Sequence, residues 1–443
     1  MKFSQDIFEQ RRDRLAQMMG ANCIAVIETS PVAMRNRDAD YKYRGDSSFY
    51  YLTGFTEPEA VAVIETFDTA EQYCYTLFCR ERHHEMEIWN GRRAGTAGAL
   101  ADYAAHEAYA IEFLDENIIE MLQAKEQLYY RIGQRRDFDH KVTDWLRQTA
   151  EQYTPAAVPK QLRQLDEIVD EMRVIKSADE IACMETAAAI SVRAHQRAMQ
   201  QVRPGMMEYA LEAELNYIFA QAGCVPAYTS IVGGGANACI LHYVENDQVL
   251  NDGDLVLIDA GCEYAYYAAD ITRTFPVNGK FSPAQKALYQ LVLDAQLAAI
   301  AAVQVGAHYH APHQVVVEIL VKGLVTLGLL HGDIDTLIED EAYRRFYMHG
   351  TGHWLGIDVH DVGAYKQQGE SRRLEAGMVL TIEPGLYIAE DDETVDAKWR
   401  GIGIRIEDDV LVTAQGPRVL TDQVAKSIDE IEQLMAQHKA ATC

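Results

Sequence analysis

The sequence predicts a protein of two parts, an α/β domain over residues 1–172 followed by an α+β domain over residues 173–443. Its 443 residues exceed what one hydrophobic core usually holds. The first third alternates helical and strand patterns, whereas the remainder repeats a longer order of two helices and then strands. A charged stretch at residues 166–173 joins the two patterns, and we place the boundary there, near Met172.

Hydrophobic periodicity predicts the elements of the first part. Residues 7–19 follow the pattern of a basic amphipathic helix, and residues 24–27 form an apolar strand. The apolar runs at residues 49–55 and 60–64 continue the strand pattern. We therefore expect a sheet with helices beside it.

The second part opens with a helix-start signal. Ser177 and Glu180 have the spacing of a capping box, in which both side chains satisfy free N–H groups of the first turn. Strand sets follow at residues 255–275 and 378–412, each after two helical patterns, which suggests a duplicated arrangement. No repeat of short period is present, so solenoids and propellers are excluded.

Composition excludes several classes of partner. The net charge is −27, which repels nucleic acid and anionic membrane surfaces and favours cations. The most apolar stretches, residues 291–305 and 315–330, are interrupted by charged and polar side chains and do not predict membrane spans.

Targeting and cysteine patterns predict a cytoplasmic protein. The first residues lack a basic region followed by an apolar run, so we expect no signal peptide. The eight cysteines are scattered without a C-x-x-C pair, as reduced core thiols are.

Two aspartates form the strongest local pattern. Asp259 ends the apolar run 255–258, and Asp270 begins a second apolar run eleven residues later. If the two runs pair as a hairpin, with the tyrosine-rich stretch between them as the turn, both carboxylates can face one pocket. An unpaired carboxylate at the end of a buried strand would be costly, so we expect a partner for each.

Three further candidates occur in the last third of the chain: His353, Glu383 and Glu407. Each alone has an ordinary explanation as an ion-pair or capping residue. Together, four carboxylates and one imidazole balance two divalent cations, and such oxygen-rich ligation favours Mn²⁺, Fe²⁺, Co²⁺ or catalytic Zn²⁺. We expect Mn²⁺ as the metal.

These segments, in this order, resemble the metal-binding motifs of the pita-bread metallopeptidases, which include methionine aminopeptidase, prolidase and aminopeptidase P. The resemblance is closest to bacterial aminopeptidase P and covers nearly the whole chain. It is carried by the segments 41–44, 52–55, 241–243, 259–276, 349–361, 383–387 and 401–408.

The resemblance implies a fold and a reaction. The second domain would be a curved antiparallel sheet backed by helices, holding two metal ions on Asp259, Asp270, His353, Glu383 and Glu407. The implied reaction is release of the N-terminal residue from peptides with proline at the second position. The implied catalytic residues are His242, His349, His360, Glu383 and Arg405.

Expulsion of a secondary amine requires a proton donor, and histidines beside the metals can supply one. The resemblance also implies a homo-oligomer, expected as a tetramer, and places Asp38 and Trp89 near the substrate.

Two alternatives remain: a prolidase, which accepts only dipeptides, and a non-catalytic pita-bread binding protein. Three other patterns carry no function in our interpretation. Gly233–Gly235 lacks the P-loop Lys and predicts a turn. His308, His310 and His313 surround a proline and predict a solvated loop. The pair His83–His84 lacks any supporting context.

Overall fold

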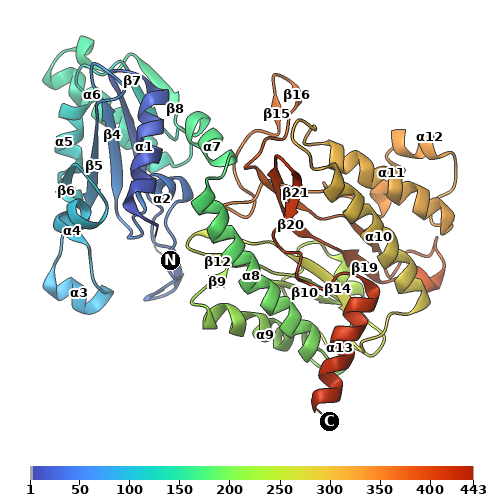
Figure 1. Ribbon diagram of the computed structural model, residues 1–443. Coiled ribbons are helices and arrows are strands. Elements are labelled where there is room, and N and C mark those ends of the chain that lie inside the picture. Colours follow the sequence, from blue (N-terminus) through green and yellow to red (C-terminus); the bar gives the residue numbers. More distant parts are fainter. Residues whose placement is uncertain (1–2, 443) are drawn as a thin grey trace. The chain divides into compact units, whose positions relative to one another are not determined.

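A computed structural model describes residues 3–442 of the chain (Figure 1). The chain forms two compact units, Met1–Met172 and Arg173–Cys443.

The first unit is built on a six-stranded sheet with the strand order β6-β5-β4-β1-β7-β8. The strand β1 pairs antiparallel with β4 and parallel with β7, so the sheet is mixed. Its strands are β1 (Cys23–Glu28), β4 (Val61–Thr66), β5 (Tyr73–Cys79), β6 (Glu107–Ala110), β7 (Gln127–Tyr130) and β8 (Gln161–Gln164).

Helices lie on the two faces of this sheet, with α1 on one side and α5 and α6 on the other (Figure 1). Ile24 and Val26 of β1 belong to one buried cluster with Ile118 of α5 and Trp145 of α6. The helices of the unit are α1 (Gln5–Met19), α2 (Ser47–Thr53), α3 (His84–Asn90), α4 (Gly95–Asp102), α5 (Leu114–Met121), α6 (Arg136–Gln152) and α7 (Asp166–Val174), which extends into the second unit.

One predicted strand is a helix. Residues 47–53 form α2, whose N-terminus is capped by Asp46 accepting from the Phe49 N–H at 2.9 Å. Gly54 ends the helix in the left-handed conformation, with φ of 66°. All seven residues are buried, and a short, largely apolar run with no exposed face has no periodicity that distinguishes helix from strand.

The second unit contains two successive helix pairs, each followed by a three-stranded antiparallel sheet. Ser177 and Glu180 form the expected capping box at the start of α8. The helix pairs are α8 (Ala178–Gln201) with α9 (Glu208–Gln221) and α10 (Pro283–Ala302) with α11 (Ala311–Thr326); α12 (Ile334–Glu339) and α13 (Ile428–Thr442) follow.

Two of the three-stranded sheets of the second unit have the orders β10-β11-β14 and β17-β20-β21. A third has the order β13-β12-β9, with β9 at Val225–Pro226, and two further pairs are β18 with β19 and β15 (Lys366–Gln367) with β16 (Glu370–Ser371). One buried cluster joins the helices to these strands. The strands are β10 (Ile231–Gly234), β11 (Leu255–Asp259), β14 (Thr272–Pro276), β17 (Val379–Ile382), β18 (Gly385–Ile388), β19 (Ile402–Arg405), β20 (Asp408–Thr413) and β21 (Gly416–Val419). The predicted fold class, α/β followed by α+β, is confirmed.

Two details differ from expectation. The tyrosine-rich stretch between Asp259 and Asp270 is not a simple turn, because it forms the small hairpin β12 (Cys262–Tyr264) and β13 (Tyr267–Ala268). The expected turn at Gly233–Gly235 is confirmed only for Gly235, which has φ of 55° and begins the 3₁₀ turn η3 (Gly235–Cys239). Gly233 and Gly234 lie in β10, where they pair with β11.

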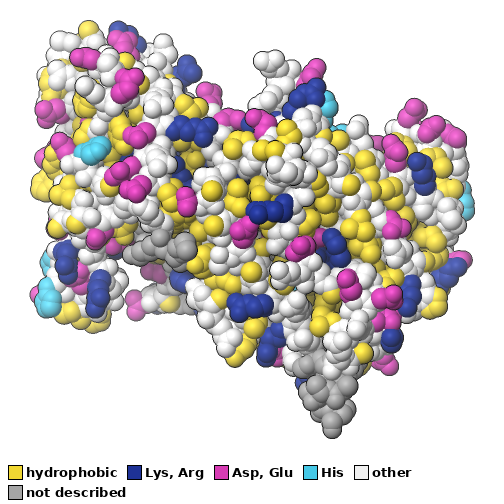
Figure 2. Space-filling model, viewed as in Figure 1, with side chains coloured by type: hydrophobic (Ala, Val, Ile, Leu, Met, Phe, Trp, Pro, Cys, Tyr) yellow, Lys and Arg dark blue, Asp and Glu magenta, His cyan; other side chains and the backbone are white. Residues whose placement is uncertain are grey.

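The surface is of ordinary character. Acidic, basic and apolar side chains are interspersed on the face of the second unit drawn in Figure 2. No helix among residues 3–442 combines the length and the apolarity needed to cross a membrane.

Candidate metal centre

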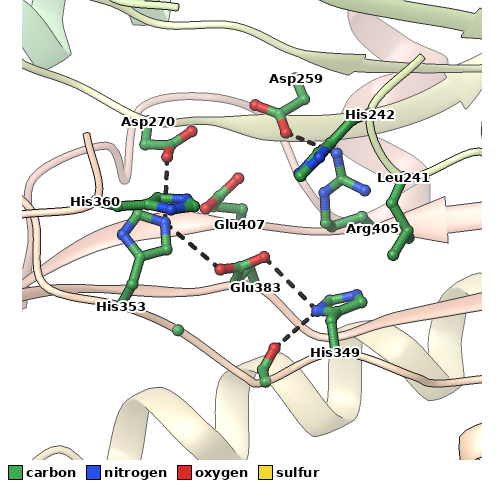
Figure 3. Close-up of a pocket in the computed structure, with 12 residues that line it drawn as sticks. Leu241, His242, Asp259, Asp270, His349, His353, His360, Glu383, Arg405 and Glu407 are labelled. Atoms are coloured by element: carbon green, nitrogen blue, oxygen red, sulfur yellow. Dashed lines mark hydrogen bonds and ion pairs between the residues drawn. The ribbon is translucent and has the colours of Figure 1, made fainter. Parts of the chain in front are cut away.

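A pocket of about 330 Å³ in the second unit brings together the residues predicted from the sequence (Figure 3). Every predicted metal ligand lines it, and so do the predicted catalytic histidines and Arg405. The lining residues are Leu241, His242, Asp259, Asp270, His349, Gly350, Gly352, His353, His360, Glu383, Arg405 and Glu407.

The antiparallel pair β11 and β14 places the two aspartates. Asp259 ends β11 opposite Thr272, and Asp270 lies just before β14 begins. The Tyr228 hydroxyl is 2.6 Å from a carboxylate oxygen of Asp259 and 2.5 Å from one of Asp270. Gly261 is required between them, because a Cβ there would lie 1.7 Å from the Ala269 carbonyl oxygen.

Glu383 and Glu407 come from loops at the ends of strands β17 to β20, whereas His353 lies in the segment that precedes β15. Glu383 follows β17 and Glu407 lies between β19 and β20. Asp270, His353 and Glu407 each offer a ligand atom within 4.8 Å of the others. The His353 Nε2 also lies 3.6 Å from Glu383 Oε1, so Glu383 joins the same cluster.

The carboxylates of the pocket carry more negative charge than the protein compensates. Burial, reinforced by the neighbouring carboxylates, raises the pKa of Glu407 well above its usual value and that of Glu383 to about 7. Burial likewise raises the pKa of Asp259 despite the nearby Arg405. Burial also opposes ionisation of Asp270, but hydrogen bonds and the charge of His353 outweigh it and lower its pKa.

His353, unlike Glu383 and Glu407, is favoured in its charged form. Burial disfavours its charged form, yet the hydrogen bond to Asp270 and the charge of Glu383 raise its pKa to about 9. The pocket therefore favours a positive charge at the point where His353 meets the carboxylates. Carboxylate oxygens and an imidazole are the ligands that divalent Mn, Fe, Co and catalytic Zn accept, so the donor set fits such ions.

Arg405 connects the carboxylates to His349. Its Nη2 lies 2.6 Å from Asp259 Oδ2, and its Nη1 donates to the Tyr387 hydroxyl at 3.1 Å. Tyr387 in turn lies 2.8 Å from His349 Nε2. Because the Nδ1 of His349 is 2.7 Å from the Gly350 carbonyl, that nitrogen carries the proton and Nε2 accepts from Tyr387. Burial lowers the pKa of His349 to about 3, so the ring is neutral.

His242 and His360 complete the wall of the pocket. The His360 ring centroid is 4.1 Å from that of His353, and burial together with His353 lowers the pKa of His360. A neutral imidazole at this position can donate one N–H toward the pocket.

Asp38 and Trp89 lie in the first unit, outside the lining of this pocket as the structure describes it. Asp38 occupies the turn between β2 (Met34–Asn36) and β3 (Ala39–Asp40), with φ of 64°. Trp89 lies on α3 and is 85 % exposed.

Sequence reasoning missed several residues that contact the predicted ligands. Tyr228 hydrogen-bonds both aspartates but belongs to no motif that would indicate it. Asp409 is buried, and its carboxylate oxygens accept from the Asp270 N–H at 3.2 and 3.3 Å. Thr272 donates to Glu407 at 2.6 Å. The sequence signal that could have found Asp409 is its position, since it is a further acidic residue directly after Glu407 and Asp408.

Comparison with known proteins agrees with this geometry. Residues 182–414 match the model of metallopeptidase family M24, and residues 8–129 match the aminopeptidase P N-terminal domain. The Xaa-Pro aminopeptidases of Escherichia coli K12 and of Haemophilus influenzae are each 45 % identical to this chain, and each alignment covers 98 % of both chains.

Solved structures show the same similarity over the full length. The aminopeptidase PepP of Pseudomonas aeruginosa has a TM-score of 0.96 and 50 % identity, covering 99 % of each chain. A zinc-substituted Escherichia coli aminopeptidase P in complex with product has a TM-score of 0.96 and 44 % identity, again covering 99 % of each chain. The predicted pita-bread fold of the second domain is therefore confirmed, and the chain belongs to metallopeptidase family M24 as a member of its aminopeptidase P group.

Proposed function

We propose that this protein removes the N-terminal residue from peptides whose second residue is proline, using two divalent metal ions. Asp259, Asp270, His353, Glu383 and Glu407 would hold the ions. When bound, the ions supply Lewis acidity and a nucleophile from water at neutral pH. The observation that carries the proposal is the gathering of these five side chains in one buried, negatively charged pocket.

The chain's own residues would donate and transfer the protons that the reaction needs. The departing group is the secondary amine of proline, which must gain a proton as the peptide bond breaks. His360 and His242 line the pocket and would donate to the substrate. Glu383, whose carboxylate lies 3.8 Å from His349 Nδ1 and 3.6 Å from His353 Nε2, would pass a proton to the leaving amine.

His349 and Arg405 would act together on the substrate carbonyl. The hydrogen bond from Tyr387 fixes the His349 tautomer, and its Nδ1–H, which donates to the Gly350 carbonyl at 2.7 Å, would be shared between that carbonyl and the substrate oxygen. Arg405, held by Asp259, keeps Tyr387 in place. A donor fixed in this way stabilises negative charge that develops on the carbonyl oxygen without reorganising.

The choice between aminopeptidase and prolidase depends on a free cation. A dipeptidase needs a positive group to bind the carboxylate of a terminal proline. Arg405 is committed to Asp259, and Arg373 donates to the Gly306 carbonyl at 2.7 Å. Arg372 is buried and does not belong to the described lining of the pocket. These placements favour an aminopeptidase that accepts peptides longer than two residues.

A comparison of three substrates tests the activity. The Mn²⁺-loaded protein is incubated with an Xaa-Pro dipeptide, an Xaa-Pro tripeptide and the matching Xaa-Ala tripeptide. We expect the Xaa-Pro tripeptide to be cleaved at least as fast as the dipeptide, and the Xaa-Ala peptide to be cleaved poorly. Hydrolysis of the dipeptide alone would indicate prolidase, and metal binding without any hydrolysis would indicate a binding protein.

We further propose Mn²⁺ as the physiological metal and the cytoplasm as the compartment. The oxygen-rich donor set supports Mn²⁺, and the cysteines of the described chain, from Cys23 to Cys262, have free thiols. Elemental analysis of protein purified without added metal would test the first proposal, and fractionation of the source cells would test the second.

We also propose a homotetramer in which Asp38 and Trp89 contact substrate at the active site of a neighbouring subunit. The exposure of Trp89 supports this role, because a surface indole is available to pack against another chain or a peptide. Light scattering that showed only monomer at micromolar concentration would contradict the tetramer. Trp89→Ala is expected to raise the KM of tripeptides.

A further inference from the structure

The segment between His349 and His353 lies between two cavities. On one side is the metal-site pocket, and on the other is a mainly apolar cavity of about 130 Å³ lined by Tyr309, His313 and Leu380, among others. Gly350 and Gly352 line both cavities. Gly350 has open space beside it, whereas a Cβ at Gly352 would lie 1.9 Å from the Thr381 carbonyl oxygen. The segment therefore approaches the neighbouring backbone closely at Gly352, and hydrogen bonds help to fix the positions of the two histidines on either side.

The Thr351 side chain supplies those hydrogen bonds on the side away from the metals. Its hydroxyl is 2.8 Å from the Nδ1 of His313 and 2.7 Å from the Tyr347 hydroxyl. Thr351 is buried, and a threonine hydroxyl has one proton. Thr351 therefore donates to at most one of these neighbours and accepts from the other or from both, and both hydrogen bonds depend on this one oxygen atom.

The same residue also holds Glu383 through its backbone. The Thr351 carbonyl accepts from the Glu383 N–H at 2.8 Å, and the His353 carbonyl accepts from the Thr381 N–H at 2.9 Å. The Tyr309 hydroxyl donates to the Gly352 carbonyl. A shift of Thr351 would thus move His353 and Glu383 together.

His313 lies in the first turn of α11 and is partly buried. The expectation of a solvated loop is wrong for this residue, because the helix directs it against Thr351 and Tyr347, with ring centroids of His313 and Tyr347 5.8 Å apart. Burial lowers the pKa of His313 to about 4, so the ring is neutral under ordinary conditions.

We propose that Tyr347, Thr351 and His313 form a hydrogen-bonded relay that positions His349, His353 and Glu383 for the reaction. The inference rests on the proposed function. The three are positioning residues, since none of them belongs to the described lining of the metal-site pocket. Loss of the relay should change two measurable quantities. The rate should change through His349, and the metal affinity should change through His353 and Glu383.

Thr351→Val tests the relay, with Thr351→Ser as the matched control. Valine keeps the shape but leaves two buried polar groups without a partner, whereas serine keeps the hydroxyl. For Thr351→Val we expect kcat on an Xaa-Pro tripeptide to fall about tenfold, with KM changed by less than about twofold, and calorimetric Mn²⁺ affinity to fall several-fold. Thr351→Ser should restore both values to within about twofold of the parent.

Further variants keep the test decisive. Tyr347→Phe removes one hydroxyl from the relay, and in the Thr351→Val background it should cause little additional loss, because the interaction is already broken. Thr326→Val, on the exposed side of α11, should change nothing. If Thr351→Val does not fold, the loss in Tyr347→Phe carries the test.

Two results would overturn the relay: parental kcat and Mn²⁺ affinity in Thr351→Val, or an equal defect in Thr351→Ser, which would assign the effect to packing. Failure of the proposed function is distinguishable, because the parent protein would then not hydrolyse the tripeptide while the Mn²⁺ titrations still compare the variants.

Discussion

Glu407 and Asp408 are neighbours in the chain and both are buried. The surroundings of Asp408 favour its ionised form, whereas those of Glu407 disfavour it. Asp408 is paired with Arg273 Nη2 and Lys426 Nζ, each at 2.7 Å, and accepts further hydrogen bonds from Gln296 and Thr421. Although burial opposes its ionisation, these cations lower its pKa. Glu407 faces Asp270 and Glu383 instead, and its pKa is raised.

This contrast separates a structural acid, Asp408, from a proposed metal ligand, Glu407. A buried carboxylate surrounded by cations and donors is fully compensated by the protein itself. A buried group of carboxylates that leaves its charge uncompensated is stable in its ionised form only when something from outside brings positive charge. The side of the strand on which each acid falls, rather than its residue type, decides its role.

The largest expected effect is the loss of activity in Glu407→Gln. An amide cannot supply the negative charge that the proposed ligand offers to a bound ion, so metal occupancy should fall and activity should drop by at least about 10³-fold. The metal-free variant should be no less stable than the metal-free parent, because burial and the neighbouring carboxylates already raise the pKa of Glu407 and favour its neutral form. Isothermal titration with Mn²⁺ and thermal melting measure the two results, and normal Mn²⁺ binding would contradict the assignment.

Asp408→Asn should lose stability and keep metal binding. The change leaves Arg273 and Lys426 buried beside a neutral group and should cost about 3–5 kcal/mol of unfolding free energy, while the protein that remains folded still binds Mn²⁺. Denaturant unfolding measures this cost. The same substitution at the exposed Asp396, paired with Lys398 at 3.4 Å, is the matched control and should cost less than about 1 kcal/mol. Equal costs at the two positions would refute the contrast.

His360→Ala is expected to have a smaller effect, confined to the rate. The residue lines the pocket but is not among the proposed ligands, so metal content should stay at the parental value while kcat falls by about 10²-fold. Parental activity in this variant would show that His360 has no role in proton donation.

The smallest effect is a difference in pH dependence. Glu383 has a folded-state pKa of about 7 against an ordinary value of 4.5, so the metal-free folded protein binds more protons than the unfolded chain between these values. Its stability should therefore decrease as the pH rises from about 4.5 to 7. The lowered pKa of Asp408 gives the opposite sign, with stability lost only as the pH falls below its ordinary value of 3.8.

Denaturant unfolding of the metal-free protein at pH 5 and pH 7.5 measures the Glu383 contribution. Glu383→Gln should reduce the difference between the two pH values, and added Mn²⁺ should abolish or reverse it, since the ions keep the carboxylates charged. An unchanged difference in Glu383→Gln would assign the effect to other groups.

The sequence predicted the pocket better than it predicted the elements around it. The strand-end positions of Asp259, Glu383 and Glu407, together with the resemblance of their motifs, predicted residues that the structure does bring into one pocket. Tyr228 could not be predicted, because its contacts with the aspartates arise only from the tertiary fold. The charge contrast between Glu407 and Asp408 is equally invisible in sequence, since Lys426 and Arg273 approach from distant segments.

Local ambiguity explains the remaining errors. Residues 49–55 are almost wholly apolar, so the Asp46 cap and Gly54 decide between helix and strand, and neither belongs to the hydrophobic pattern. His313 follows a proline that suggested a loop, but proline is compatible with the first turn of a helix, where its missing N–H is not needed.

Metal content measured beside activity tests the central claim most directly. The protein is dialysed against a strong chelator and titrated with Mn²⁺, while elemental analysis and hydrolysis of an Xaa-Pro tripeptide are followed in the same samples. We predict no turnover in the metal-free protein, uptake of about two ions per chain as four carboxylates require for charge balance, and activity that rises with occupancy. Full activity in a sample that contains no metal would contradict the account.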